Sequence, residues 1–237
     1  MMALQLRSAK REFRTELESR PASYSKNPVV ALKALAMLSP SNLSAKEFAE
    51  LKYTLPEAGR WHELHDGQTV LLSAPDEVHG TVVLNITRAL AEWFQMQPQK
   101  SRGYACHDLG LHVHSEPDTV YVPTVSIFRE GKLFGQFDHV IATEVPTIVI
   151  DVASSNDRRR DMRLRTSAYM HHGVECVWVP DPFKKEIQVI RNSKHTLALG
   201  KWQILNADDL LPGFTMSVES VFREPKWWDG KLPEAES

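Results

Sequence analysis

The chain has 237 residues, of which 42% are hydrophobic and 24% are charged, and its formal net charge is −2. This length and apolar content suit one globular domain with an extension, and they exclude a chain that is disordered throughout. No run approaches the roughly 18 apolar residues of a membrane-spanning helix, and the first residues lack the apolar core of a signal peptide. We therefore expect a cytoplasmic protein with no membrane partner, in which Cys106 and Cys176 are reduced.

The first 40 residues are expected to form an N-terminal extension. Residues 1–28 are polar and without periodicity, whereas residues 29–38 are apolar and predict a short helix. Residues 1–33 contain seven Lys or Arg against three Glu, so this arm could either contact phosphate or remain solvated.

The next part of the chain predicts two helices separated by a hairpin. Ser44 and Glu47 have the spacing of a capping box, which predicts a helix start. Asp66-Gly67 predicts the turn of a β-hairpin, and Asp76 caps a long helix that runs to about Met96. Apolar residues at helical spacing predict the buried stripe of this helix: Val78, Val82, Val83, Ile86, Leu90, Trp93 and Phe94.

The remaining sequence predicts strands around one central βα unit. Residues 147–153 form a nearly continuous apolar run, typical of a strand covered on both faces, and a helix over residues 157–172 follows, ended by Gly173. The other predicted elements are strands over 103–106, 109–113, 119–122, 125–128, 176–179 (before a break at 180–182), 186–191 and 195–199, and a short helix over 217–222. This order indicates an α/β or α+β domain.

Asp151 is the most informative residue because it lies within the apolar strand. A buried carboxylate costs several kcal/mol unless it is paired or binds a metal, so a structural ion pair and a ligand or catalytic role are both open. Asp157, Asp161, Arg165 and Tyr169 follow at a spacing that predicts one face of the helix. A carboxylate that faces an Asp, a cation and a Tyr suits a phosphodiester site, although Asp161 and Arg165 also have the spacing of an ordinary surface pair.

Residues 157–165 contain five arginines against two aspartates and form the second basic cluster of the chain. Such a cluster could contact phosphate or could be a solvated helix face. Ser154-Ser155 lacks the sequence context of a hydrolase nucleophile, so no such role is predicted for it. The residues that we expect to contact nucleic acid are Arg158, Arg159, Arg160, Asp161 and Tyr169.

Several stretches carry a resemblance to a known family, and they occur in order over residues 41–223. They are SAKEFAEL (44–51), WHELHDG (61–67), SAPDEVHG (73–80), VPTVSIF (122–128), IVIDVASS (148–155), Asp161-x-x-x-Arg165-x-x-x-Tyr169 with Gly173-Val174, VWVPDP (177–182) and LPGF (211–214). In these stretches the chain resembles the Uma-type restriction endonuclease family, which lies within the PD-(D/E)xK nuclease superfamily.

The resemblance implies a metal centre, but the chain departs from the family pattern at three positions. The family has an Asp where this chain has Thr124, a Glu where it has Asp151, and a Lys where it has Arg165. Thr is a neutral and poor ligand for Mg²⁺, and Arg cannot lose a proton near neutral pH to act as a general base. Glu63 and His79 match the family pattern and are expected to line the same cleft.

We therefore predict an α/β fold with a restriction-endonuclease-like core, in which helices flank a mixed β-sheet. The expected divisions are an N-terminal arm and helix (1–40), the nuclease-like domain (41–223) and a C-terminal tail (224–237). By the resemblance, the catalytic residues are Glu63, His79, Thr124, Asp151 and Arg165, and the metal ligands are Asp151 and Glu63.

Three functional hypotheses stay open. The first is an endonuclease that hydrolyses DNA with Mg²⁺ or Mn²⁺ at an altered site. The second is a catalytically inactive relative that binds nucleic acid, and the third is a protein that binds a protein partner or forms a homodimer.

Overall fold

The computed structural model describes residues 42–98, 103–129, 139–192 and 195–225, all of which belong to one compact unit, Ser41–Ser237. The predicted arm and helix of residues 1–40 lie outside the described residues. The described helices are α3 (Ala45–Lys52), the 3₁₀ turn η1 (Pro56–Gly59), α4 (Glu77–Met96), α5 (Asn156–His172) and α6 (Val218–Val221). Within this part of the chain no helix has the length and apolar character needed to cross a membrane.

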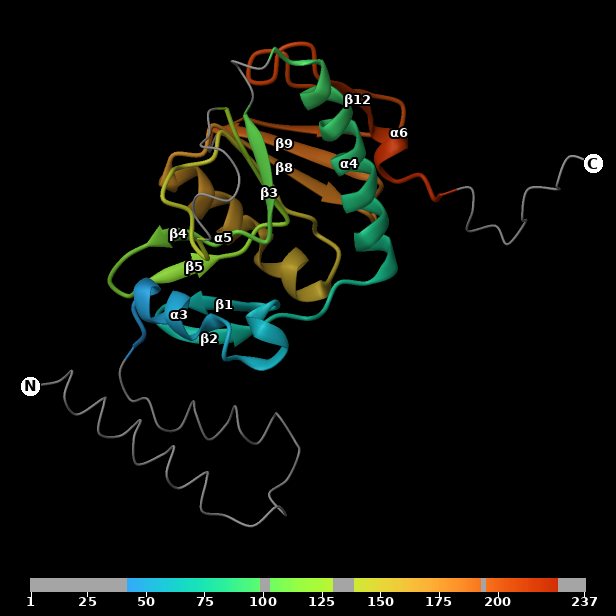
Figure 1. Cartoon of the computed structure of the whole chain (residues 1–237). Coiled ribbons are helices and arrows are strands. Elements are labelled where there is room, and N and C mark those ends of the chain that lie inside the picture. Colours follow the sequence, from blue (N-terminus) through green and yellow to red (C-terminus); the bar gives the residue numbers. More distant parts are fainter. Residues whose placement is uncertain (1–41, 99–102, 130–138, 193–194, 226–237) are drawn as a thin grey trace, which may run out of the picture. The chain divides into compact units, whose positions relative to one another are not determined.

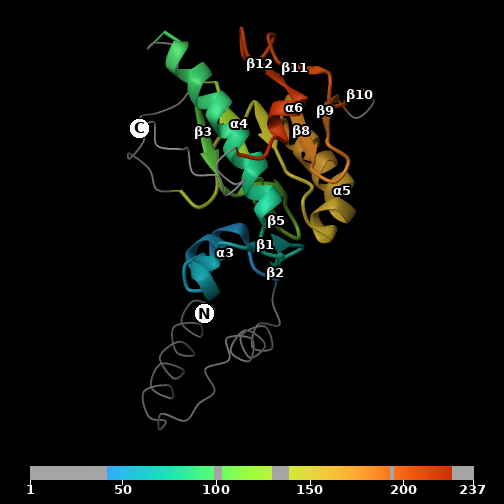
Figure 2. The same cartoon turned by 90° about the vertical axis from the view of Figure 1, so that its right-hand side faces the viewer.

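The main layer is a mixed six-stranded sheet in the order β10-β9-β8-β7-β6-β3. Its strands are β3 (Tyr104–His107), β6 (Val125–Phe128), β7 (Ile148–Ile150), β8 (Cys176–Asp181), β9 (Glu186–Asn192) and β10 (His195–Leu199). Only β7 and β8 pair in parallel, and α5 provides the crossover between them. Helices α4 and α5 lie on opposite sides of this sheet (Figures 1 and 2).

A second sheet has the order β2-β1-β5-β4 and lies beside α3 at the lower end of the domain in Figure 1. Its strands are β1 (His62–His65), β2 (Gln68–Leu71), β4 (Leu111–His114) and β5 (Thr119–Tyr121), and a separate two-stranded ribbon joins β11 (Ile204–Asn206) to β12 (Thr215–Ser217). The β1–β2 turn is formed by Asp66 and Gly67, whose φ angles of 48° and 76° are those of a tight hairpin.

Strand alternation divides the core into two apolar clusters, one on each face of the main sheet. Ile148 and Ile150 of β7 pack in the larger cluster with the buried residues of α4, whereas Val149 packs with Met162 and Tyr169 of α5. The strand covered on both faces was expected from its apolar run, and the structure confirms it.

The local predictions hold with three corrections. Ser44 and Glu47 form the capping box at α3, and Asp76 caps α4. The strand predicted over residues 147–153 is shorter, since β7 ends at Ile150, and β8 runs through the predicted break to Asp181 because it pairs with β9. Val78, predicted in the buried stripe, is 52% exposed in the first turn of α4, where His79 and Thr81 are the buried residues instead.

Candidate functional site

Five side chains from three parts of the chain form a buried carboxylate–arginine network. Glu63 comes from β1, Asp151 from the segment directly after β7, and Arg158, Arg165 and Tyr169 from α5. Glu63, Asp151 and Tyr169 have no exposed surface, and Arg165 is only 2% exposed. Asp151 follows the last residue of β7 and contacts Arg158 in the first turn of α5. Glu63 of β1 contacts Arg165 of the same helix.

Arg165 lies between the two carboxylates and binds both. Its Nη1 and Nη2 donate to Glu63 Oε2 and Oε1 at 2.7 and 2.9 Å, and its Nε donates to Asp151 Oδ2 at 2.7 Å. Its guanidinium carbon also lies 4.6 Å from the centre of the Tyr121 ring, within the range of a cation–π contact. Burial lowers the pKa of Arg165, but Asp151, Tyr169 and Glu63 raise it well above its usual value, so the guanidinium keeps its charge.

Asp151 has two further partners. Arg158 Nη1 donates to Asp151 Oδ1 at 2.9 Å, and the Tyr169 hydroxyl donates to Oδ2 at 2.9 Å. The same hydroxyl accepts a hydrogen bond from Arg165 Nη2 at 3.0 Å, so Tyr169 links Asp151 to Arg165. Burial, opposed by Arg165 and reinforced by Asp151, raises the pKa of Tyr169 well above its usual value, and the hydroxyl therefore stays protonated.

Glu63 is held by its own set of donors. The backbone N–H of Val122 donates to Oε1 at 2.7 Å, and His65 Nε2 lies 2.8 Å from Oε2. Burial raises the pKa of Glu63, but Arg165, His65 and the Val122 amide together lower it to about 2. Glu63 is therefore ionised at neutral pH although it is fully buried.

The donor set does not fit a divalent metal. All four carboxylate oxygens of Glu63 and Asp151 are already bound by protein donors, and two guanidinium groups balance the two negative charges. Hard cations such as Mg²⁺ need several free oxygen ligands, and a guanidinium between the carboxylates repels them. Among the described residues, no three His, Cys, Asp or Glu side chains are grouped to hold a metal ion.

Thr124, at the position of the family's aspartate, has a structural contact. It is 5% exposed, and its Oγ1 accepts a hydrogen bond from the Val152 backbone N–H at 3.2 Å. The hydroxyl thus joins the start of β6 to the segment after β7. It adds no negative charge to the network.

His79 lies near the network but binds a different residue. It is 9% exposed in the first turn of α4, and its Nδ1 lies 2.7 Å from Ser154 Oγ. Burial and Arg158 both lower the pKa of His79, more than Asp151, Asp76 and Asp108 raise it. Ser154 itself is half-buried, in the turn that leads into α5.

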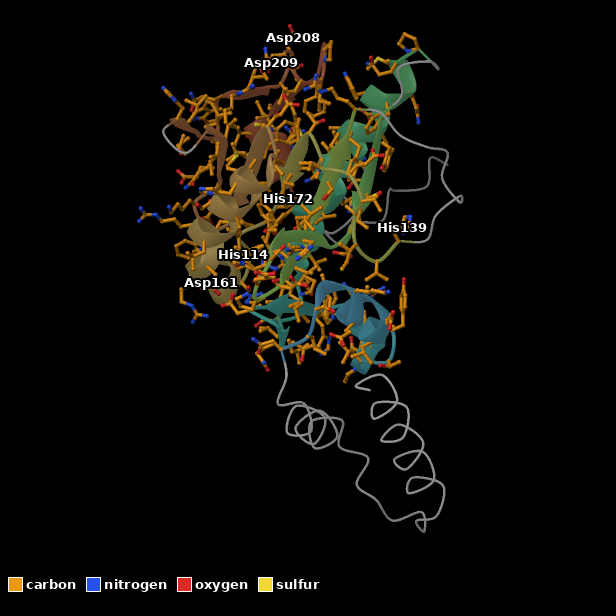
Figure 3. All side chains as sticks on the ribbon, turned by 90° about the vertical axis from the view of Figure 1, so that its left-hand side faces the viewer. His114, His139, Asp161, His172, Asp208 and Asp209 are labelled. Carbon is orange, nitrogen blue, oxygen red and sulfur yellow. The ribbon has the colours of Figure 1, made fainter. Side chains whose placement is uncertain are left out.

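The other residues predicted to contact nucleic acid occupy different environments. Arg159 is half-buried, donates to the Ala153 carbonyl at 3.0 Å and lies over the Phe183 ring. Arg160 is 71% exposed and pairs with Asp161 at 3.1 Å, and Asp161 lies at the outer side of α5 (Figure 3). The structure therefore brings Arg165 and Tyr169 to Asp151 but leaves Asp161 outside the network.

Sequence reasoning missed the roles of Arg158 and Ser154. Arg158 was assigned to nucleic acid together with its neighbours, yet it is 9% exposed and neutralises Asp151. The signal available was its position one helical turn from the capping residue Ser155, which directs its side chain back toward the end of β7. For Ser154 the sequence held no such signal, because its partner His79 is 75 residues away.

The fold defines an α/β protein with a nuclease-like core. The model of the Uma2 family, described as "Putative restriction endonuclease", matches residues 45–219, and the chain belongs to this family. The predicted family and fold class are thereby confirmed.

One solved structure supports the fold. It is the crystal structure of a putative nuclease belonging to DUF820 from Anabaena variabilis ATCC 29413, which is similar to this chain with a TM-score of 0.58 and 18% sequence identity. The match covers 76% of this chain and 97% of that one, and at 18% identity it supports the fold alone. No curated protein matches the chain.

Proposed function

We propose that this protein is a nucleic-acid-binding member of the endonuclease family in which arginine, and not a divalent metal, lies between the two site carboxylates. The observation that carries the proposal is the position of Arg165, which donates three hydrogen bonds to Glu63 and Asp151. Nucleases of this class generally depend on a divalent metal, so replacing it removes their usual source of a nucleophilic water.

The charges of the network support this proposal. The charges of two carboxylates and two guanidinium groups sum to zero, so the buried site is neutral without any metal ion. To bind a metal, Glu63 and Asp151 would have to give up their bonds to Arg165. The side chain of Arg165 is only 2% exposed, so its charge would then be buried without a partner. Removing a buried ion from its partner costs about 3–5 kcal/mol, which opposes the exchange.

DNA is the proposed partner because the family is described as a putative restriction endonuclease and because α5 carries exposed arginines beside the network. Arg160 and Arg163 are both exposed, and they belong to the first half of the helix. Guanidinium groups bind phosphate through several N–H donors and release counterions when they do so. The contacts would be made to the backbone, and affinity would depend strongly on salt.

The test measures binding of a fluorescent DNA duplex by anisotropy, in EDTA and at graded salt. We expect Arg160→Ala and Arg163→Ala each to weaken binding and to lower the slope of log K against log salt by about 1. Arg223→Ala is the matched control, since Arg223 is 60% exposed beside α6, on the α4 side of the sheet. Affinity that is unchanged in both α5 variants would contradict the proposed surface.

A metal-dependent DNA endonuclease is the second candidate, and one observation favours it. Glu63 is ionised, and the single guanidinium of Arg165 bridges it to Asp151. The two carboxylates could therefore bind a metal between them if Arg158 and Arg165 moved away. This candidate expects plasmid nicking that needs Mg²⁺ or Mn²⁺ and is lost in Asp151→Ala. The homodimer, the protein partner and the cytoplasmic location stay predictions.

A further inference from the structure

The pair formed by Ser154 and His79 has the composition of a nucleophile and its base. Ser154 Oγ lies 2.7 Å from His79 Nδ1, within the range in which a histidine can take a hydroxyl proton. The two residues come from opposite sides of the main sheet's end, the α4 start and the turn before α5. Serine is half-buried and histidine nearly buried, so the hydroxyl is the more accessible member of the pair.

Both members are held in place by their own backbones. The His79 N–H donates to the capping carboxylate of Asp76 at 2.8 Å, and the Ser154 N–H donates to the Val152 carbonyl at 2.9 Å. These bonds fix the backbone at both residues, and the 2.7 Å contact between Oγ and Nδ1 holds the two side chains together. Fixed reacting groups lower the entropy that a reaction must otherwise lose.

We propose that Ser154 attacks a phosphodiester with His79 as its general base, so that this protein cleaves phosphodiesters without a metal through a covalent phosphoserine. The inference rests on the proposed function, because it takes the bound nucleic acid as the substrate. It also gives the site a reaction that does not require Glu63 or Asp151 to release their arginines.

The protonation state of His79 agrees with this role. Four charged groups act on it: Arg158 of α5, Asp151 after β7, Asp76 at the α4 cap, and Asp108 between β3 and β4. Burial and Arg158 dominate and lower its pKa, so the ring is neutral at neutral pH and one ring nitrogen can accept a proton. With its proton on Nε2, His79 accepts from the serine hydroxyl at Nδ1.

The reaction balances with water as the only co-reactant. The Ser154 hydroxyl proton passes to His79 Nδ1 while Oγ bonds to phosphorus, and the bond from phosphorus to the leaving sugar oxygen breaks. The leaving oxygen departs on the side opposite Oγ and takes its proton from water, while the imidazolium stays beside Oγ. Water then bonds to phosphorus and releases a proton to solvent, the phosphorus–Oγ bond breaks, and the His79 imidazolium returns its proton to Ser154 Oγ.

Groups beside Ser154 can bind the phosphate oxygens during both steps. Helix α5 begins two residues after Ser154, and its first backbone N–H groups have no acceptor within the helix, although Ser155 Oγ already accepts from the N–H of Arg158 at 3.1 Å. The Arg159 guanidinium contacts the carbonyl of Ala153, one residue before the serine. A phosphate at Ser154 would therefore meet backbone donors and a cation.

The experiment uses the full chain in EDTA with two substrates. Hydrolysis of bis(4-nitrophenyl) phosphate measures phosphodiester cleavage without DNA recognition, and denaturing gels with labelled DNA detect a covalent protein–DNA adduct. We expect activity and adduct in the parent, and a loss of about 100-fold in Ser154→Ala and in His79→Gln. Ser167→Ala is the matched control, because Ser167 is an exposed serine of α5 that also contacts a histidine, His171.

The outcomes separate this inference from the proposed function. A parent that binds DNA but forms no adduct and cleaves neither substrate in EDTA would overturn the inference alone. A parent that fails to bind DNA would overturn the proposed function, while Ser154-dependent hydrolysis of the small diester would still support the pair. Activity that persists in Ser154→Ala would also overturn the inference, provided that circular dichroism shows the variant to be folded.

Discussion

Arg165 and Glu63 are separated by 102 positions in the chain and form a two-pronged ion pair, with N–O distances of 2.7 and 2.9 Å. The pair joins α5, which covers the main sheet, to β1 of the second sheet. Parallel N–H donors of this kind fix the orientation of the carboxylate as well as its distance, which a lysine ammonium does not. An arginine at the position where the resemblance expects a lysine therefore changes what the site can hold.

Arg165→Met is expected to destabilise the protein by about 3–5 kcal/mol, because it leaves two buried carboxylates without their shared cation. Urea denaturation measures the change in the free energy of unfolding. Arg163→Met, at an exposed position of the same helix, should change stability by less than about 0.5 kcal/mol. Equal effects of the two substitutions would contradict the central position of Arg165.

Acid should destabilise the protein through Glu63. Its pKa is about 2 in the folded chain against 4.5 for an unperturbed Glu, so the folded state favours the ionised form. The stabilisation is present above pH 4.5 and is lost as the pH falls from about 4.5 to about 2. Glu63→Gln should flatten the pH dependence of thermal unfolding in this window, whereas the exposed Glu50→Gln should retain it.

Tyr169→Phe is expected to cost about 1–2 kcal/mol. The substitution removes the hydroxyl that donates to Asp151 and accepts from Arg165 but leaves the ring in place. Chemical denaturation of Tyr169→Phe beside Tyr53→Phe, at a position that is 61% exposed, provides the measurement. If Tyr169→Phe were as stable as the parent, the hydroxyl would not contribute to the network.

Thr124→Val should cost about 1–3 kcal/mol although it preserves the shape of the side chain. The Val152 amide is buried and donates to Thr124 Oγ1, so the valine leaves it without an acceptor. Thr69→Val, on the half-buried strand β2, serves as the control in the same denaturation experiment. A neutral Thr124→Val would mean that the hydroxyl has no structural role.

Structural features that depend only on residues near in sequence could be predicted from the sequence. The complete carboxylate–arginine network could not. The capping box of Ser44 and Glu47 and the Asp66-Gly67 turn act within a few residues, and both were predicted correctly. Two of the three side chains that bind Asp151 were predicted. Arg165 and Tyr169 were placed on one helix face, but Arg158 was expected to contact nucleic acid, whereas it donates to Asp151.

The contacts that could not be predicted join residues that are far apart in the sequence. The contact of Glu63 with Arg165 and that of His79 with Ser154 depend on how β1 and α4 pack against α5, which helical or strand spacing does not encode. The resemblance placed Glu63 and His79 in one cleft, but their partners came only from the structure. For the same reason the corrected end of β8 follows from pairing with β9, which continues the strand through Pro180 to Asp181.

Calorimetric titration of Mn²⁺ into the purified protein, beside Asp151→Ala, tests the central claim most directly. The account predicts no binding heat in either protein, because arginine and tyrosine already bind the oxygens that a metal would need. Thr124→Asp combined with Arg165→Lys brings back the aspartate and the lysine that the resemblance expects, and should gain Mn²⁺ binding if it folds. Mn²⁺ binding by the parent that disappears in Asp151→Ala would contradict the account.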